Sequence, residues 1–133
     1  MTGLFKKKQQ DKGSKFLKTK KSELKKLVKE KKYDTVLKVG EEILKKHPDD
    51  IDTLFILGGL FYMRDKLSKA ITYFDRLLET STYDPEALLL KAKSHYTLGQ
   101  FKESKTSCEK IQEIDPKNKE VLELLEKISN NIN

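Results

Sequence analysis

Four kinds of residue in this sequence could take part in chemistry: two histidines, one cysteine, a pair of adjacent glycines and many lysines. His47 and His95 lie far apart, and neither has a second histidine or a carboxylate at the spacing of a metal site. Cys108 is the only cysteine, which excludes an intramolecular disulfide and a metal site built from cysteines. No nucleophile is paired with a base. The sequence therefore predicts no catalytic residue, no metal and no cofactor, and indicates that the protein is not an enzyme.

The paired glycines, Gly58 and Gly59, lie in the most apolar stretch of the chain, TLFILGGLFYM at residues 53–63. A phosphate-binding loop needs a lysine after its glycines, and none follows here. The uninterrupted apolar run from Leu54 to Met63 is also about half of the roughly 20 residues that a membrane-spanning helix needs. These exclusions favour a buried helix.

The lysines are concentrated at the N-terminus. Residues 1–32 contain 13 lysines and three acidic residues, whereas the rest of the chain has 15 basic and 18 acidic residues. We expect residues 1–16 to form a flexible basic arm that either contacts nucleic acid, a ribosome or an anionic membrane surface, or is only a solvated tail. The arm residues are Lys6, Lys7, Lys8, Lys12 and Lys15.

Apolar and small residues recur along the chain with a period of about 34 residues, a spacing that is typical of repeat proteins. Within each period the apolar residues follow helical spacing, as in Leu54, Leu57 and Phe61, and a polar turn then leads into a second helical pattern. Asp84 precedes Pro85 as a helix N-cap precedes its first residue. Matching triplets are Leu27, Phe61 and His95; Val36, Ala70 and Ser104; Ile43, Leu77 and Ile111; and Tyr33, Leu67 and Phe101.

The central period, LFILGGLFYMRDKLSKAITYF, resembles the tetratricopeptide repeat (TPR) family. It has the Leu-Gly pair of that family at Leu57 and Gly58, the aromatic residue at Phe61, and a small residue followed by an aromatic one at Ala70 and Phe74. Residues 91–116 resemble a second copy, and residues 22–48 resemble a degenerate first copy. The resemblance implies an all-α fold, an α-solenoid of helix–turn–helix repeats.

This resemblance divides residues 17–133 into a TPR domain of three repeats, at about residues 17–50, 51–84 and 85–116, and a C-terminal capping helix at 117–133. The last segment has Val121, Leu124, Leu125, Ile128 and Ile132 on one face and charged residues on the other. A terminal helix of this kind is needed because a last repeat without a cap would expose apolar surface. We therefore expect seven helices.

The first helix of each repeat lines a concave groove in this family, so the resemblance implies which side chains would contact a partner. The first repeat contributes a stripe of lysines, and the next two contribute apolar and aromatic residues. Gly59 faces this groove and either leaves room for a ligand or is merely tolerated there. The predicted groove residues are Lys21, Lys25, Lys29, Phe55, Ile56, Gly59, Tyr62, Met63, Leu89, Lys93 and Tyr96.

TPR domains that bind the C-termini of chaperones resemble one another in a clamp of lysine, asparagine and arginine around a carboxylate. The corresponding positions here hold Lys21 and Lys25, then Ile56, then Glu86 and Leu90. Only the first lysine matches, and Glu86 would repel a carboxylate, so this role is disfavoured.

We therefore expect a small cytoplasmic adaptor that binds a peptide or a helix with apolar and acidic residues in its groove. The alternative is association with nucleic acid, a ribosome or an anionic membrane through the lysine-rich N-terminal region. The capping helix, the arm or a second copy of the chain could also cover the groove, so self-association is a further possibility.

Overall fold

The computed structural model describes the backbone of residues 2–132 and the side chains of residues 13–131. Within that part of the chain there are seven helices and no strand, which confirms the predicted all-α fold. The helices are α1 (Thr2–Lys29), α2 (Tyr33–Lys46), α3 (Ile51–Met63), α4 (Leu67–Thr80), α5 (Pro85–Thr97), α6 (Phe101–Ile114) and α7 (Lys119–Ile132). They form two compact units, Met1–Thr53 and Leu54–Asn133, so the boundary falls within α3.

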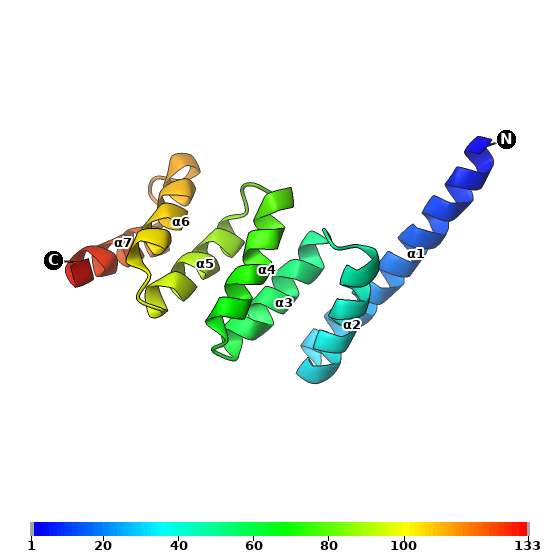
Figure 1. The fold of residues 1–133 in the computed structure, drawn as a ribbon, viewed down its shortest axis with the longest axis horizontal. Helices are drawn as coiled ribbons and strands as arrows, with labels where there is room; N and C mark the ends of the chain where they lie inside the picture. The colour runs from blue at the N-terminus through cyan, green and yellow to red at the C-terminus, as the bar shows by residue number, and fades with distance from the viewer. Residues whose placement is uncertain (1, 133) are drawn as a thin grey trace. The chain divides into compact units, whose positions relative to one another are not determined.

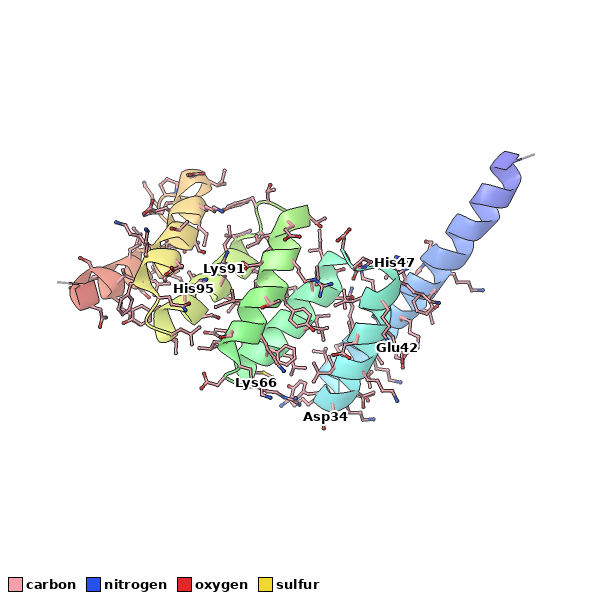
Figure 2. All side chains as sticks on the ribbon, viewed as in Figure 1. Asp34, Glu42, His47, Lys66, Lys91 and His95 are labelled. Carbon is pink, nitrogen blue, oxygen red and sulfur yellow. The ribbon has the colours of Figure 1, made fainter. Side chains whose placement is uncertain are left out.

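Unit 1 is a helical hairpin in which α2 packs against the C-terminal half of α1 (Figure 1). Its buried residues include Leu24 from α1 and Val36, Val39 and Ile43 from α2. At the end of the hairpin, the rings of Phe16 and His47 stack with their centroids 6.3 Å apart. On the flank, Lys20 of α1 pairs with Glu42 of α2 at 3.1 Å (Figure 2).

The segment predicted to be a flexible arm is part of α1. The helix begins at Thr2 and continues without interruption to Lys29, and it extends past the end of α2 (Figure 1). The sequence allows this continuity, because residues 1–16 contain no proline. Independent motion of this segment stays a prediction.

Unit 2 contains the larger part of α3 followed by α4, α5, α6 and α7, in which α4 packs on α5, α5 on α6 and α6 on α7. In the view of Figure 1, α4 and α6 lie in front of α3 and α5. The rings of Phe61 in α3 and Tyr73 in α4 stack at 5.5 Å between centroids. One core cluster, formed by α5, α6 and α7, contains Leu88, Ala92, Cys108, Ile111, Val121, Leu124 and Ile128.

The turns between the paired helices recur with the period of the sequence repeat. Lys31, Asp65 and Gly99 each have a positive φ, of 58°, 60° and 76°. At each turn, two backbone N–H groups donate to carbonyls of the preceding helix, as from Lys31 to Val28 and from Lys32 to Leu27. This bonding pattern is the Schellman motif, which satisfies the last carbonyls of a helix.

The helices that follow the longer turns share a second periodic feature. The side chains of Asp50, Asp84 and Asn118 accept hydrogen bonds from backbone N–H groups three residues later, at 3.0 or 3.1 Å. These residues cap α3, α5 and α7, and each is one repeat period from the next. Phe16 occupies the preceding position of this series. It lies inside α1 and its side chain has no hydrogen-bond acceptor, so no N-cap of this kind begins a helix there.

In the described part of the chain, no helix combines the length and the apolar character that crossing a bilayer would require.

Candidate functional site

The α3 helix is buried on most of its circumference but leaves one apolar side less covered. Leu54, Leu57 and Phe61 are buried, as the sequence predicted for the side that faces the repeat core. The other side contains Phe55, Ile56 and Tyr62, which are half-buried, and Met63, which is 59% exposed. These are the residues that the sequence assigned to the groove.

The two adjacent glycines of α3 differ in their surroundings. A Cβ atom added to Gly58 would lie 2.6 Å from the ring of Phe74 in α4, so a side chain there would force that buried ring to move. A Cβ added to Gly59 would meet no atom within 4 Å. Gly59 is therefore open on the same side as Phe55 and Tyr62, and nothing in the packing of unit 2 requires it to be glycine.

The α5 helix contributes Leu89, Lys93 and Tyr96, all half-buried. Leu89 and Tyr96 also pack against the core cluster of unit 2, so they have structural as well as surface roles. Lys91 lies on another side of α5 and pairs with Asp75 of α4 at 2.7 Å (Figure 2).

The end of this surface is closed by α7, one of the three covers that the sequence allows. The ammonium group of Lys93 pairs with Glu120 at 3.0 Å, and the side-chain amide of Asn131 donates a hydrogen bond to the hydroxyl of Tyr96 at 2.8 Å. A pocket of about 320 Å³ remains between the helices. It is lined by Tyr62, Lys93, Tyr96, Thr97, Glu120, Glu123, Leu124 and Lys127.

In unit 1, the three predicted groove lysines differ in their surroundings. Lys21 pairs with Asp50 at 3.2 Å and with Asp52 at 2.7 Å, and its bond to Asp52 is the main reason that its pKa is raised. Lys25 and Lys29 are exposed and form no ion pair with any side chain that the structure describes. A shallow depression of about 430 Å³ on this side of α1 is lined by Ser14, Leu17, Lys18, Lys21, Ser22 and Lys25.

Asp50 accepts three hydrogen bonds within unit 1. One oxygen accepts bonds from the backbone and hydroxyl of Thr53, and the other accepts from Lys21. Burial raises the pKa of Asp50, but the bonds from Thr53 and Lys21 outweigh burial and hold this pKa below its ordinary value. Asp50 is not among the residues predicted from the sequence, although its position one repeat period before Asp84 is a signal that identifies it.

Among the basic residues assigned to the arm, Lys15 is exposed. Lys6, Lys7, Lys8 and Lys12 lie outside the residues whose side chains the structure describes.

The histidines and the cysteine, which could take part in chemistry, lie apart from one another. The ring of His47 stacks on Phe16, and Nδ1 of His95 hydrogen-bonds to the side chain of Gln100 at 2.7 Å. Cys108 is fully buried, as expected, and burial together with the charge of Glu109 raises its pKa to about 11. Within the described residues, no three histidine, cysteine or acidic side chains are close enough to hold a metal ion.

A family model described as "Tetratricopeptide repeat" matches residues 61–128, which is just over half of the chain. The chain belongs to the tetratricopeptide repeat family. This confirms the resemblance seen in the sequence of the central and third repeats. TPR domains are in general a non-catalytic fold for protein interaction.

Solved TPR structures share the fold of this chain at low sequence identity. The first TPR of Spaghetti (RPAP3), solved with the HSP90 peptide SRMEEVD, matches with a TM-score of 0.78 and 19% identity, covering 87% of this chain and 92% of that one. The MamA protein matches with a TM-score of 0.81 and 13% identity, covering 87% of this chain and 63% of that one.

The second TPR domain of human RPAP3, solved with the HSP70 peptide SGPTIEEVD, has a TM-score of 0.73 and 17% identity, covering 83% of this chain and 92% of that one. No curated protein sequence matches. At these identities the structural matches establish the fold.

Proposed function

We propose that this TPR protein is a non-catalytic adaptor that holds a segment of a partner protein in the groove lined by α3 and α5. The observation that supports this most is the exposure of apolar residues on α3. Phe55, Ile56 and Tyr62 are only half-buried and Met63 is exposed, although the remaining sides of this helix are covered. Apolar groups that are contiguous at a surface usually mark an interaction site.

Gly59 supports the same proposal. A glycine inside a helix costs about 1 kcal/mol relative to alanine. At Gly58 the close contact with Phe74 explains why a glycine is present. At Gly59 no contact within unit 2 explains it. A partner backbone that passes close to α3 would use the space that a side chain at position 59 would fill.

The proposed ligand is an apolar segment and not a C-terminal carboxylate. The two RPAP3 domains were solved with peptides that end in EEVD. In this chain, the clamp-like positions of α3 and α5 hold Ile56, Glu86 and Leu90, none of which is a cation. Lys21, the one matching cation, is already neutralised by Asp50 and Asp52. Apolar anchors are therefore the better means of recognition.

We also propose where the ligand-binding surface ends. Lys93 and Tyr96 contact α7, so the ligand would end near the pocket that those residues line. The partner contacts predicted for Lys25 and Lys29 of α1 stay predictions and are not part of the α3 and α5 surface. A cytoplasmic location agrees with a single unpaired cysteine. Self-association stays a prediction.

The test is a selection of binding peptides from a random display library, followed by NMR mapping on the labelled protein. Selected peptides should be rich in apolar residues and should shift the amide signals of α3 and α5. Met63→Glu should weaken their binding at least tenfold, because it places a charge in the apolar surface. Ile114→Glu is the matched control, since Ile114 is an apolar residue that is 67% exposed on α6.

Peptides that bind equally well to both variants, or that shift signals only outside α3 and α5, would contradict the proposal. A peptide ending in EEVD should bind more weakly than the selected peptides. Preferential binding of that peptide would instead indicate a carboxylate clamp.

A further inference from the structure

The exposed side of α1 presents lysines and no carboxylate between residues 14 and 29. At 100° per residue, the side chains of Lys18, Lys25 and Lys29 lie within a narrow arc. Ser14 and Ser22 lie in the same arc, and Lys15 and Lys26 lie at its edge. Glu23 projects to another side of the helix, where Lys20 pairs with it at 3.5 Å. We call this surface the lysine face, and it consists of Ser14, Lys15, Lys18, Lys21, Ser22, Lys25, Lys26 and Lys29.

The lysines of the lysine face differ in whether they already have an acidic partner within the protein. Lys21 is neutralised by Asp50 and Asp52. The pKa of Glu30 is lowered mainly by Lys32 and to a smaller extent by Lys26. Lys26 therefore has an acidic neighbour in Glu30. Four others are exposed and form no ion pair with any described side chain: Lys15, Lys18, Lys25 and Lys29.

These four ammonium groups are spread along about 21 Å of helix axis, at a rise of about 1.5 Å per residue. Like charges one helical turn apart repel each other and destabilise a helix by a few tenths of a kcal/mol per pair. No described acidic side chain of unit 1 pairs with Lys25 or Lys29 and offsets that repulsion. A bound polyanion would compensate it.

The lysine face lacks the apolar groups that other anionic partners require. Stable protein interfaces are centred on buried apolar or aromatic anchors, and amphipathic helices bind membranes by inserting apolar side chains. Leu17 at the edge of the face is half-buried. Phe16 is occupied by the ring of His47 and by the ammonium group of Lys46, which lies 4.1 Å from its centroid. Neither is free to serve as an anchor.

The lack of aromatic side chains on the lysine face also favours a nucleic-acid duplex over a single strand. Proteins that bind single strands stack the bases on aromatic side chains, and the described lysine face offers none. Arginine, which reads guanine edges, is also absent from α1. Phosphate contacts, by contrast, need only cations, and counterion release supplies the affinity. We propose that the lysine face of α1 binds the phosphate backbone of a nucleic-acid duplex without reading its sequence. This site is separate from the α3 and α5 surface.

The experiment measures fluorescence anisotropy of a labelled 20-base-pair DNA duplex with the full-length protein between 50 and 200 mM salt. Each neutralised phosphate contributes about −0.9 to the slope of log K against log salt. The double variant Lys18→Gln/Lys25→Gln should therefore reduce the steepness of the slope by about 1.8. At 50 mM salt it should also bind several-fold more weakly than the wild type.

The matched control is Lys105→Gln/Lys110→Gln, which removes the same charge from two exposed positions of α6. This control should retain the wild-type slope. An RNA duplex and a DNA duplex of scrambled sequence should bind with similar affinity, since no base is read. Equal losses in the two double variants would show that only net charge matters, and this would overturn the proposal.

Two other partners are tested in parallel. Vesicles of phosphatidylcholine and phosphatidylserine in a three-to-one ratio, and a poly-glutamate peptide, should each bind more weakly than the duplex at the same salt concentration. Tighter binding to either of these, or to a single strand, would overturn the duplex assignment. The circular dichroism spectrum of each variant should match that of the wild type, because the replaced lysines are exposed.

Discussion

At the scale of single residues, Gly58 and Gly59 show that one residue type can be present for opposite reasons. Both lie in the middle of α3, where glycine is the poorest helix former apart from proline. Gly58 is buried against the ring of Phe74, whereas Gly59 is open. The first glycine is part of the packing between α3 and α4, and the second borders open space.

Replacing each of these glycines by alanine should therefore change the free energy of unfolding in different ways. Gly59→Ala should stabilise the protein by about 1 kcal/mol, because it gains helix propensity without a clash. Gly58→Ala gains the same propensity but forces the buried ring of Phe74 to move, at a cost of about 1–3 kcal/mol. Urea denaturation followed by circular dichroism measures both values.

The two variants control for each other, since the substitution, the helix and the neighbouring sequence are the same. Their difference isolates the overpacking cost. Equal stabilities of Gly58→Ala and Gly59→Ala would show that the contact between α3 and α4 adjusts without cost, and that the close approach is not a requirement of the fold.

At the scale of helices and turns, the repeat period made most of the architecture predictable. Apolar residues that recur in register fix which side of each helix is buried, so the fold class and the buried side of α3 followed from the sequence. The turn at residues 64–66 was also visible, because Arg64, Asp65 and Lys66 interrupt two apolar patterns.

Other features could not be read from periodicity. The contacts of α7 with Lys93 and Tyr96 join long side chains that are 27 and 35 residues apart in sequence. Such pairs depend on rotamers and on the docking of α7, not on a repeating pattern. The helical start of α1 was not predicted because residues 1–16 show no apolar period, although no proline interrupts them.

The left-handed residues of the hairpin turns give a prediction at this scale. Gly99 adopts a positive φ without strain, whereas Lys31 and Asp65 adopt it despite carrying a Cβ atom. A left-handed residue other than glycine costs about 1–2 kcal/mol, and aspartate tolerates it better than lysine. Lys31→Gly should therefore stabilise the protein by up to about 1 kcal/mol, and Asp65→Gly by less.

Thermal and urea unfolding of the two variants provide the measurement. Gly99→Ala is the reverse test and should lower stability by about 1 kcal/mol, since the same Schellman motif must then hold an alanine at positive φ. A destabilised Lys31→Gly variant would mean that the lysine side chain supports the turn by a contact that outweighs its backbone strain.

At the scale of the whole molecule, the described part of the chain is a short repeat array in which α7 packs on α6 and α5. In such arrays each element contacts mainly its neighbours, so one helix can open while the rest stays folded. Cys108 lies in the core cluster to which α7 contributes Val121, Leu124 and Ile128. The thiol is therefore a probe for the opening of this end of the solenoid.

In the closed state, Cys108 is protected in two ways. It is fully buried, and its pKa of about 11 lies above the ordinary value of 9.0, so the reactive thiolate is scarce at neutral pH. Because the folded pKa is raised, the stability linked to this group is complete below about pH 9. It is lost as the pH rises from about 9 towards 11, where only an exposed thiol ionises readily.

The rate of alkylation of Cys108 by iodoacetamide at pH 8 should consequently report how often α7 opens. Ile128→Val removes one buried methylene and should destabilise the docked helix by about 0.5–1.5 kcal/mol, which corresponds to a rate increase of about twofold to tenfold. Val36→Ala in unit 1 is the control. It removes buried apolar atoms outside the core cluster of α5, α6 and α7 and should lower overall stability without changing the alkylation rate. An equal acceleration in both variants would mean that Cys108 reacts only after global unfolding, so that the array unfolds as one cooperative body and α7 has no opening of its own.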